Sequence, residues 1–181
     1  MPAAHKDAIT AAFRGVQDQI SAFLSGEDKP FREDAWDYAS GQGGGVTRTW
    51  EDGSLLEKGG VGFSAITGTS LPPAAATQFK IAPGTSFYAT GVSLVMHPRN
   101  PHVPTIHMNV RYFEAGDSWW FGGGVDLTPY YPEQAQVVGF HRALRGLCDS
   151  HGRDYGAMLS RCGDLERREQ IVDRSKGTAA H

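Results

Sequence analysis

The stretch SLVMHPRNPHVPTIHMNVRYFE, residues 93–114, decides the fold that this sequence predicts. Apolar and polar residues alternate over 87–97 and again over 105–113, on the two sides of three prolines. A period of two is typical of β-strands that bury one face. Proline is excluded from central strands, so the segment between the two runs is expected to be a stiffened turn that joins two antiparallel neighbours.

The flanking segments extend this pattern into a larger sheet. A third strand is predicted in SWWFGGGVDLTPYYP (118–132), which follows the second after a short link. TRTW (47–50) and GSLLEKGGVGFSAITG (53–68) predict strands earlier in the chain, with glycine turns between them. Residues 72–84 are rich in Pro and Ala and are expected to form a loop or an irregular connection.

Helical spacing of apolar residues appears before and after the strands. Residues 6–24 predict an amphipathic helix, and the segment after Glu133 predicts a second one. The apolar stripe of the first is Ile9, Phe13, Val16, Ile20 and either Phe23 or Leu24, and that of the second is Val137, Phe140, Leu144 and Leu147. Together these patterns predict helices at both ends of the chain and an antiparallel sheet between them.

The composition is that of a globular protein and argues against several functional classes. Hydrophobic residues make up 40% and charged residues 20% of the 181 residues, and the net charge is −3. A negative net charge speaks against general nucleic-acid binding. No apolar run reaches the length of a membrane span, and we expect a cytoplasmic location. Cys148 and Cys162 lack a CxxC spacing and are expected to be reduced thiols.

Candidate functional residues gather on the polar side of the two central strands. His107, Asn109 and Arg111 alternate on one face of one strand, and Ser93 and His97 share a face of the other. A solvated sheet face would show the same alternation, but these residue types favour recognition. Arginine can clamp a carboxylate, asparagine fixes polar edges, and histidine transfers protons.

Two further features leave alternatives open. His97, His107 and His141 have a geometrically allowed but not diagnostic spacing for a metal site, whereas His102 is expected to be a loop residue. Asp126 follows three glycines that permit a large ligand to approach the backbone closely. It is interpreted either as a site carboxylate or as a turn residue before Thr128.

Several long stretches resemble the oxygen-dependent coproporphyrinogen III oxidase family. The matching segments are FREDAW with the following GGG (31–45), EKGGVGFS (57–64), SLVMHPRNPHVPTIHMNVRYFE (93–114), WWFGGGVDLTPYYP (119–132) and FHRALRGLCD (140–149). The third and fourth of these segments are long and highly specific. The resemblance covers the chain from near its N-terminus to about residue 158.

This resemblance implies an α+β fold, a large antiparallel sheet flanked by helices, in a domain over 1–160. It also implies a reaction and a set of roles. It implies a dimeric protein that uses molecular oxygen as co-substrate to convert two propionates of coproporphyrinogen III into vinyl groups, giving protoporphyrinogen IX, CO2 and hydrogen peroxide. No organic cofactor is implied, and a divalent metal, with manganese as the candidate, is left open. His107, Asp126 and Arg111 would be the catalytic residues: His107 would be the proton donor, Asp126 would meet the pyrrole N–H groups and Arg111 would meet a propionate. Ser93, Asn109, Val110 and Arg111 would bind the substrate, and His97, His107 and His141 would be the metal ligands.

The sequence departs from the family at two places. Gly62 stands where the family usually has asparagine, and the resemblance ends near Cys162. Residues 161–181 form no apolar stripe, so we expect a divergent, disordered or irregular tail on a truncated or frame-shifted chain with an incomplete sheet. The alternative function that follows is an inactive or degenerate tetrapyrrole-binding domain.

Overall fold

The computed structural model describes residues 3–38 and 41–159 of this chain. The chain divides into two compact units, Met1–Tyr131 and Pro132–His181. The first unit carries the sheet with helices α1 and α2, and the second carries helix α3. The predicted domain boundary at residue 160 and the predicted tail over 161–181 lie outside the described residues.

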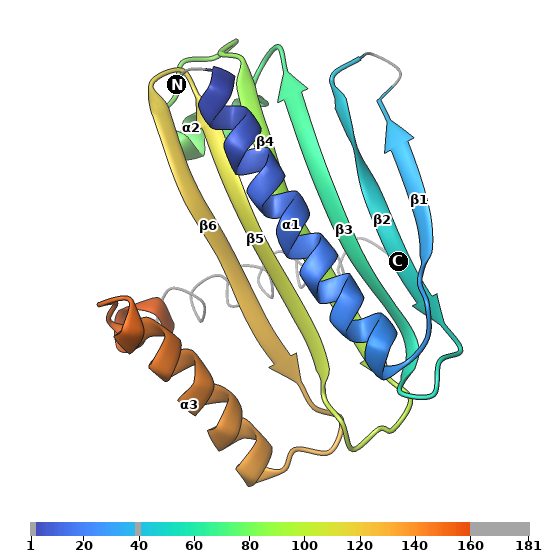
Figure 1. Cartoon of the computed structure of the whole chain (residues 1–181). Coiled ribbons are helices and arrows are strands. Elements are labelled where there is room, and N and C mark those ends of the chain that lie inside the picture. The colour runs from blue at the N-terminus through green and yellow to red at the C-terminus, as the bar shows by residue number, and fades with distance from the viewer. Residues whose placement is uncertain (1–2, 39–40, 160–181) are drawn as a thin grey trace, which may run out of the picture. The chain divides into compact units, whose positions relative to one another are not determined.

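The first unit is built on a meander of six strands (Figure 1). Each strand pairs antiparallel with the next along the chain, which confirms the predicted α+β class and antiparallel sheet. Its elements are α1 Ala3–Glu27, β1 Arg32–Asp37, β2 Gly43–Glu51, β3 Leu56–Gly68, α2 Pro73–Phe79, β4 Phe87–Pro98, β5 Thr105–Ala115 and β6 Ser118–Thr128. Gly116 adopts a φ of +58° in the two-residue link between β5 and β6, a conformation that glycine tolerates best.

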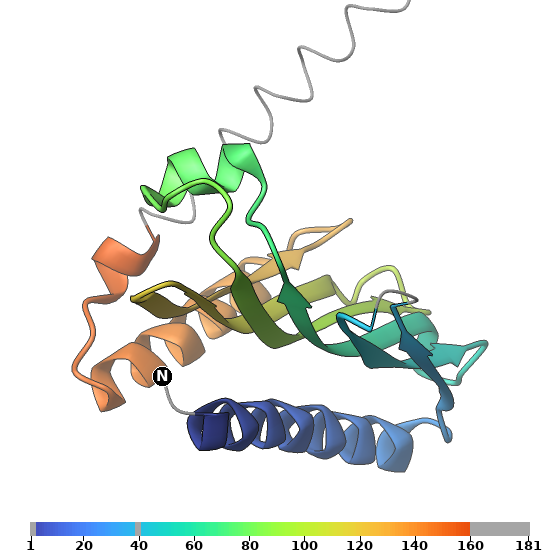
Figure 2. The same ribbon diagram turned by 90° about the horizontal axis from the view of Figure 1, so that it is seen from above.

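Helix α1 covers one face of the sheet, which we call the helix face. In Figure 2 this helix lies along one side of the sheet and α2 lies on the opposite side. The apolar stripe predicted for α1 packs against the buried core, with Leu24 at the last position, whereas Phe23 is 67% exposed. The buried core residues contributed by the sheet are Trp50, Leu56, Val61, Phe63, Val92, Met96 and Tyr112.

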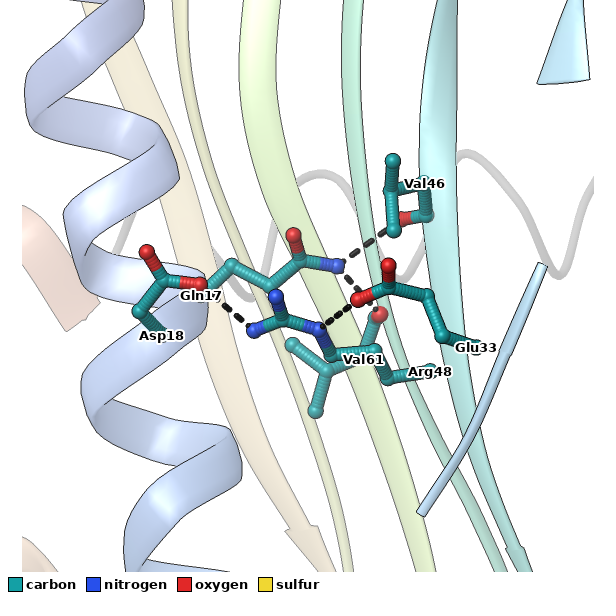
Figure 3. A network of polar contacts seen from close by, with 6 residues as sticks. All are labelled: Gln17, Asp18, Glu33, Val46, Arg48 and Val61. Atoms are coloured by element: carbon teal, nitrogen blue, oxygen red, sulfur yellow. Dashed lines mark hydrogen bonds and ion pairs between the residues drawn. The ribbon is translucent and has the colours of Figure 1, made fainter. Parts of the chain in front are cut away.

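A fully buried glutamine joins α1 to two strands (Figure 3). The side-chain amide nitrogen of Gln17 donates hydrogen bonds to the backbone carbonyls of Val46 on β2 and Val61 on β3, at 2.8 and 2.9 Å. A buried polar group is costly unless it is hydrogen-bonded. These two bonds therefore fix the position of α1 along the strands as well as its contact with the sheet.

Arg48 adds a charged tie beside this glutamine (Figure 3). Its guanidinium donates to Asp18 on α1 at 2.7 Å and to Glu33 on β1 at 2.8 Å. Burial acts to lower the pKa of Arg48, but its hydrogen bonds and charge contacts with the two carboxylates raise it. The arginine stays charged and links the helix, the edge strand β1 and strand β2.

Glu114 forms a second buried polar cluster near the start of α1. The Tyr112 hydroxyl donates to Glu114 at 2.8 Å, and Lys6 Nζ lies 3.0 Å from the same carboxylate. Burial first and the Glu114 carboxylate second raise the pKa of Tyr112 to about 12. Burial acts to raise the pKa of Glu114 as well, but the bonds from Tyr112 and Lys6 outweigh it, so that this pKa is lowered.

The segment 72–84 differs from its prediction because it contains helix α2. Pro73 stands at the first helical positions, where a missing N–H costs nothing, and three alanines follow it. Lys80 ends the helix in the left-handed conformation at φ +55°. Seven residues are too few for helical periodicity to be visible in the sequence.

The described part of the second unit contains α3, Gln134–Ser150, which confirms the predicted second helix. Cys148 lies on this helix as a free thiol, and Cys162 lies outside the described residues. None of the helices in the described ranges is long and apolar enough to cross a membrane.

We predict that Asp28 stabilises the link between α1 and the β2–β3 turn in a pH-dependent way. Its carboxylate accepts hydrogen bonds from the Ser54 and Leu56 backbone N–H groups at 2.6 and 2.9 Å. Burial acts to raise the pKa of Asp28, but these bonds outweigh it and lower the pKa below its ordinary value of 3.8. Asp28→Asn should therefore cost about 1 kcal/mol of unfolding free energy at pH 7.

The sign of the pH dependence follows from the lowered pKa. The stabilisation is present above the unfolded-state pKa and is lost as the pH falls through the lower folded-state pKa. Thermal unfolding of wild type and Asp28→Asn should thus differ at pH 7 and converge in acid, while the exposed control Asp117→Asn stays close to wild type throughout. A difference for Asp28→Asn that persists unchanged below pH 3 would contradict this role.

Candidate functional site

The residues singled out in the sequence lie together on the face of the sheet opposite to α1. Ser93 pairs with Asn109 across β4 and β5, and His107 pairs with Asp126 across β5 and β6. Directly paired residues of antiparallel strands project to the same face. We call this the polar face, defined by the side chains of Ser93, His97, His107, Asn109, Arg111 and Asp126. The predicted adjacency of the two central strands is confirmed.

His107 and Asp126 form a hydrogen-bonded pair on this face. His107 Nδ1 lies 2.8 Å from Asp126 Oδ1, and the Thr128 hydroxyl donates to the same oxygen at 3.2 Å. An ionised carboxylate only accepts, so Nδ1 carries the proton and the carboxylate fixes the ring orientation. Both side chains are nearly half exposed. The arrangement leaves Nε2 of His107 as the atom suited to proton transfer.

Arg111 and Asn109 form a second pair. The guanidinium of Arg111 donates through Nη2 to Asn109 Oδ1 at 2.9 Å. This contact uses one of five donor N–H bonds of an exposed arginine, so the side chain is held in place and still suited to a carboxylate ligand. Val110 lies between them but projects to the helix face, where it packs against the core. Only its backbone belongs to the polar face.

Two of the three predicted metal ligands are neighbours. The ring centroids of His97 and His107 lie 6.3 Å apart, and His97 Nδ1 is 3.4 Å from the Thr105 hydroxyl. His141 belongs to the second unit, where its Nδ1 lies 2.5 Å from the Tyr155 hydroxyl. Within the described part of the first unit, no group of three or more His, Cys, Asp and Glu side chains is arranged to hold a metal ion. The metal site stays a prediction.

A hollow of about 360 Å³ adjoins the pair of Arg111 and Asn109. Its floor consists of small residues on β3 and β4: Gly62, Ser64, Gly91 and Ser93. Asn109 and Arg111 stand at its β5 end. Ligand pockets range over roughly 300–1,000 Å³, so this space is suited to part of a sizeable ligand. A Cβ atom at Gly62 would meet nothing closer than 3.9 Å, which shows that the glycine leaves room above the sheet.

The opposite end of the hollow carries residues that sequence reasoning missed. Trp36 on β1 and Thr47 on β2 line it there. The sequence signal for Trp36 was the alternation of Arg32, Asp34 and Trp36, which places its aromatic ring on the same side of the strand as two charges. The alternation alone could not assign Trp36 to the site, because the two are connected only by pairing that runs from β1 across four further strands.

Comparison with known proteins shows the family to which the chain is similar. Residues 8–165 match the family model described as coproporphyrinogen III oxidase. A protein of Dictyostelium discoideum named oxygen-dependent coproporphyrinogen-III oxidase is 53% identical, over 84% of this chain and 52% of its own length. Proteins of the same name from Prochlorococcus marinus (strain NATL1A) and Synechococcus sp. (strain CC9605) are 48% and 47% identical, over 77% and 82% of this chain. The chain spans about 40–52% of the length of these three relatives.

Proposed function

Since this chain belongs to the coproporphyrinogen III oxidase family, we propose that its polar face binds coproporphyrinogen III and supports the oxygen-dependent oxidative decarboxylation of that substrate to protoporphyrinogen IX. The observation that carries the proposal is the joint placement of two pairs, His107 with Asp126 and Arg111 with Asn109, beside a glycine-floored hollow. One pair is suited to proton transfer and the other to carboxylate binding.

Substrate binding is assigned to the β4–β5 part of the face. Coproporphyrinogen III carries four propionates, and an arginine held by Asn109 offers a planar donor group to one of them. Ser93 lies directly opposite Asn109 and supplies a hydroxyl at the same level of the sheet. Gly62 and Gly91 keep the backbone accessible, so that a broad ring system can lie close to the sheet.

The overall reaction places a requirement on the proton donor. For each propionate, a C–H bond β to the carboxylate and the bond to the carboxylate carbon break, CO2 leaves, and a C=C bond forms. The two electrons released reduce molecular oxygen to hydrogen peroxide. Starting from a carboxylate, the balance consumes one proton for each vinyl group formed. We assign its delivery to Nε2 of His107, with Asp126 holding the imidazole in the required tautomer.

The direct test is turnover by the purified chain. It is incubated with coproporphyrinogen III and oxygen, and protoporphyrin fluorescence is followed after oxidation of the product. Binding of the fluorescent tetracarboxylate coproporphyrin III is measured in parallel for wild type and Arg111→Ala. Turnover supports the proposal, and binding that Arg111→Ala loses without turnover supports the alternative of an inactive tetrapyrrole-binding domain. If neither protein binds nor reacts, both ideas are excluded.

A histidine metal site is kept as a second candidate because His97 and His107 lie close together. These two side chains would hold a divalent metal, manganese being the candidate, which would supply a Lewis acid. Purification without a tag, followed by elemental analysis, should then give stoichiometric metal that His97→Ala loses. Metal-free protein with full turnover would exclude this candidate.

We also propose that the protein is a homodimer located in the cytoplasm, as expected from the family. Size-exclusion chromatography with light scattering should give twice the 19.6 kDa of one chain. Microscopy of a tagged protein in its native cells checks the location. A monomer at micromolar concentration, or fluorescence confined to an organelle, would contradict the respective statement.

We predict that Gly62→Val blocks ligand binding without unfolding the sheet. The added side chain has room, because a Cβ there meets only the Ser93 carbonyl at 3.9 Å, and valine is a better strand residue than glycine. It would, however, fill the floor of the hollow. Affinity for coproporphyrin III should fall at least tenfold while the melting temperature stays the same or rises.

The matched control for this substitution is Gly60→Val. Gly60 lies two residues earlier on the same strand and face, with a nearest contact of 3.8 Å, and is not among the residues that line the hollow. It should weaken binding less than Gly62→Val does. Equal affinities of wild type and Gly62→Val would show that the ligand does not lie on this floor.

A further inference from the structure

Trp36 is the aromatic residue on the edge strand that faces the hollow. It is half-buried, whereas the other residues of β1 are exposed, and it lines the hollow together with Asn109 and Arg111. Its register explains this. Trp36 pairs with Gly45, Gly45 with Ser64, Ser64 with Gly91 and Gly91 with Arg111, so one row crosses five strands on the polar face.

The three positions between the tryptophan and the arginine are all small. The glycine on β2 is covered by the indole itself, and the serine and glycine on β3 and β4 leave an open floor that is bounded by the indole at one end and a guanidinium at the other. Four strand spacings separate the backbones of Trp36 and Arg111, roughly 19 Å at 4.8 Å each, and the two side chains reach toward each other over part of that span. A ligand that fills this row must be flat, partly apolar at one end and anionic at the other.

The indole of Trp36 is held in position from two sides. A Cβ built on Gly45 would stand 2.5 Å from its ring atom Cζ2, so the ring lies directly across the glycine. Tyr38 meets the ring edge-on, with centroids 5.4 Å apart and planes at 87°. An aromatic ring fixed in this way loses little entropy on binding, which is the property of an anchoring residue.

We propose that Trp36 is a substrate-positioning residue, a stacking wall for the tetrapyrrole on the side of the hollow opposite to Arg111. This rests on the proposed function and extends it to strand β1. The ring of the substrate contacts the indole while a propionate reaches the arginine, so the two residues fix the direction in which the macrocycle lies. Trp36 stands too far from His107 to take part in proton transfer.

A positioning wall of this kind has a kinetic signature. Contacts made equally in the bound substrate and in the transition state raise KM when removed and leave kcat nearly unchanged. Trp36→Ala should therefore raise KM, and weaken coproporphyrin III binding, about five- to tenfold, with kcat within about a factor of two to three. Trp36→Phe should recover most of the loss because it keeps an aromatic face.

The experiment measures coproporphyrin III binding, steady-state kinetics and the melting temperature for wild type, both Trp36 variants and Trp119→Ala. Trp119 is the matched control because it is 53% exposed and lies on the helix face of β6. Stacking also predicts quenching of Trp36 emission by the bound porphyrin, which Trp36→Phe removes and Trp119→Ala does not.

The outcomes separate this inference from the function on which it rests. If wild type binds and Arg111→Ala does not, but Trp36→Ala binds like wild type, the stacking wall is overturned and the proposed function stands. A loss in kcat alone, or a loss matched by Trp119→Ala, also overturns it. If wild type does not bind coproporphyrin III at all, the proposed function and the wall fall together.

Discussion

Replacing His107 with alanine should lower kcat for protoporphyrinogen formation by about two to four orders of magnitude, the usual contribution of a general acid. The reason is that His107 is the imidazole whose Nδ1 is tied to a carboxylate, which leaves Nε2 poised to donate. KM should change little, because the proton is needed in the transition state and not for binding. Stopped assays of protoporphyrin fluorescence over a range of substrate concentrations give both constants.

Two other histidines make this prediction specific. His102 lies in the link between β4 and β5, stacked on the ring of Tyr131 at 4.9 Å, and His102→Ala should keep wild-type turnover. His97→Ala distinguishes proton transfer from metal binding, because a metal site would lose its ion and its activity with either histidine. Full activity of His107→Ala would exclude it as the proton donor.

The largest loss of stability is expected for Trp50→Ala. Trp50 is a fully buried member of the core, donates from Nε1 to the Lys29 carbonyl at 2.9 Å, and meets the Phe31 ring edge-on at 5.6 Å. Truncating a buried aromatic residue of this size costs about 3–5 kcal/mol through lost burial and the cavity left behind. Domains of this kind unfold with only about 5–15 kcal/mol, so much of the stability would be lost.

Urea denaturation followed by circular dichroism measures this loss. Trp119→Ala again serves as the matched control, since the same truncation at a half-exposed position should cost less than about 1 kcal/mol. If both variants unfolded at the same urea concentration, burial of Trp50 would not be a main source of stability.

Much of the architecture could be read from local patterns in the sequence. Alternation over 87–97 and 105–113 requires one face to be buried, and this face became the surface under α1. The helical stripe of α1 was equally visible, although only packing separated Leu24 from Phe23. Helix α2 was not predicted, because its seven residues are too few to show a helical period of apolar residues.

The sequence predicted the polar residues of each strand, but it did not predict how those residues come together in one site. The polar residues of β4 and β5 could be recognised as candidates by their type, since alternating histidine, asparagine and arginine favour recognition over a merely hydrated face. The sequence could not show that Asp126 stands against His107, because that depends on which residues pair across the β5–β6 turn. A register shifted by one residue would have turned the aspartate to the other face.

What the sequence determined by itself is therefore which side of each strand is polar, since side-chain direction follows from a local period of two. The tertiary structure alone decided which polar sides meet. Trp36 and Arg111 are 75 positions apart in the chain and belong to one hollow only because four successive strand pairings carry the same row across the sheet. Register is a property of paired strands, so no single segment contains it.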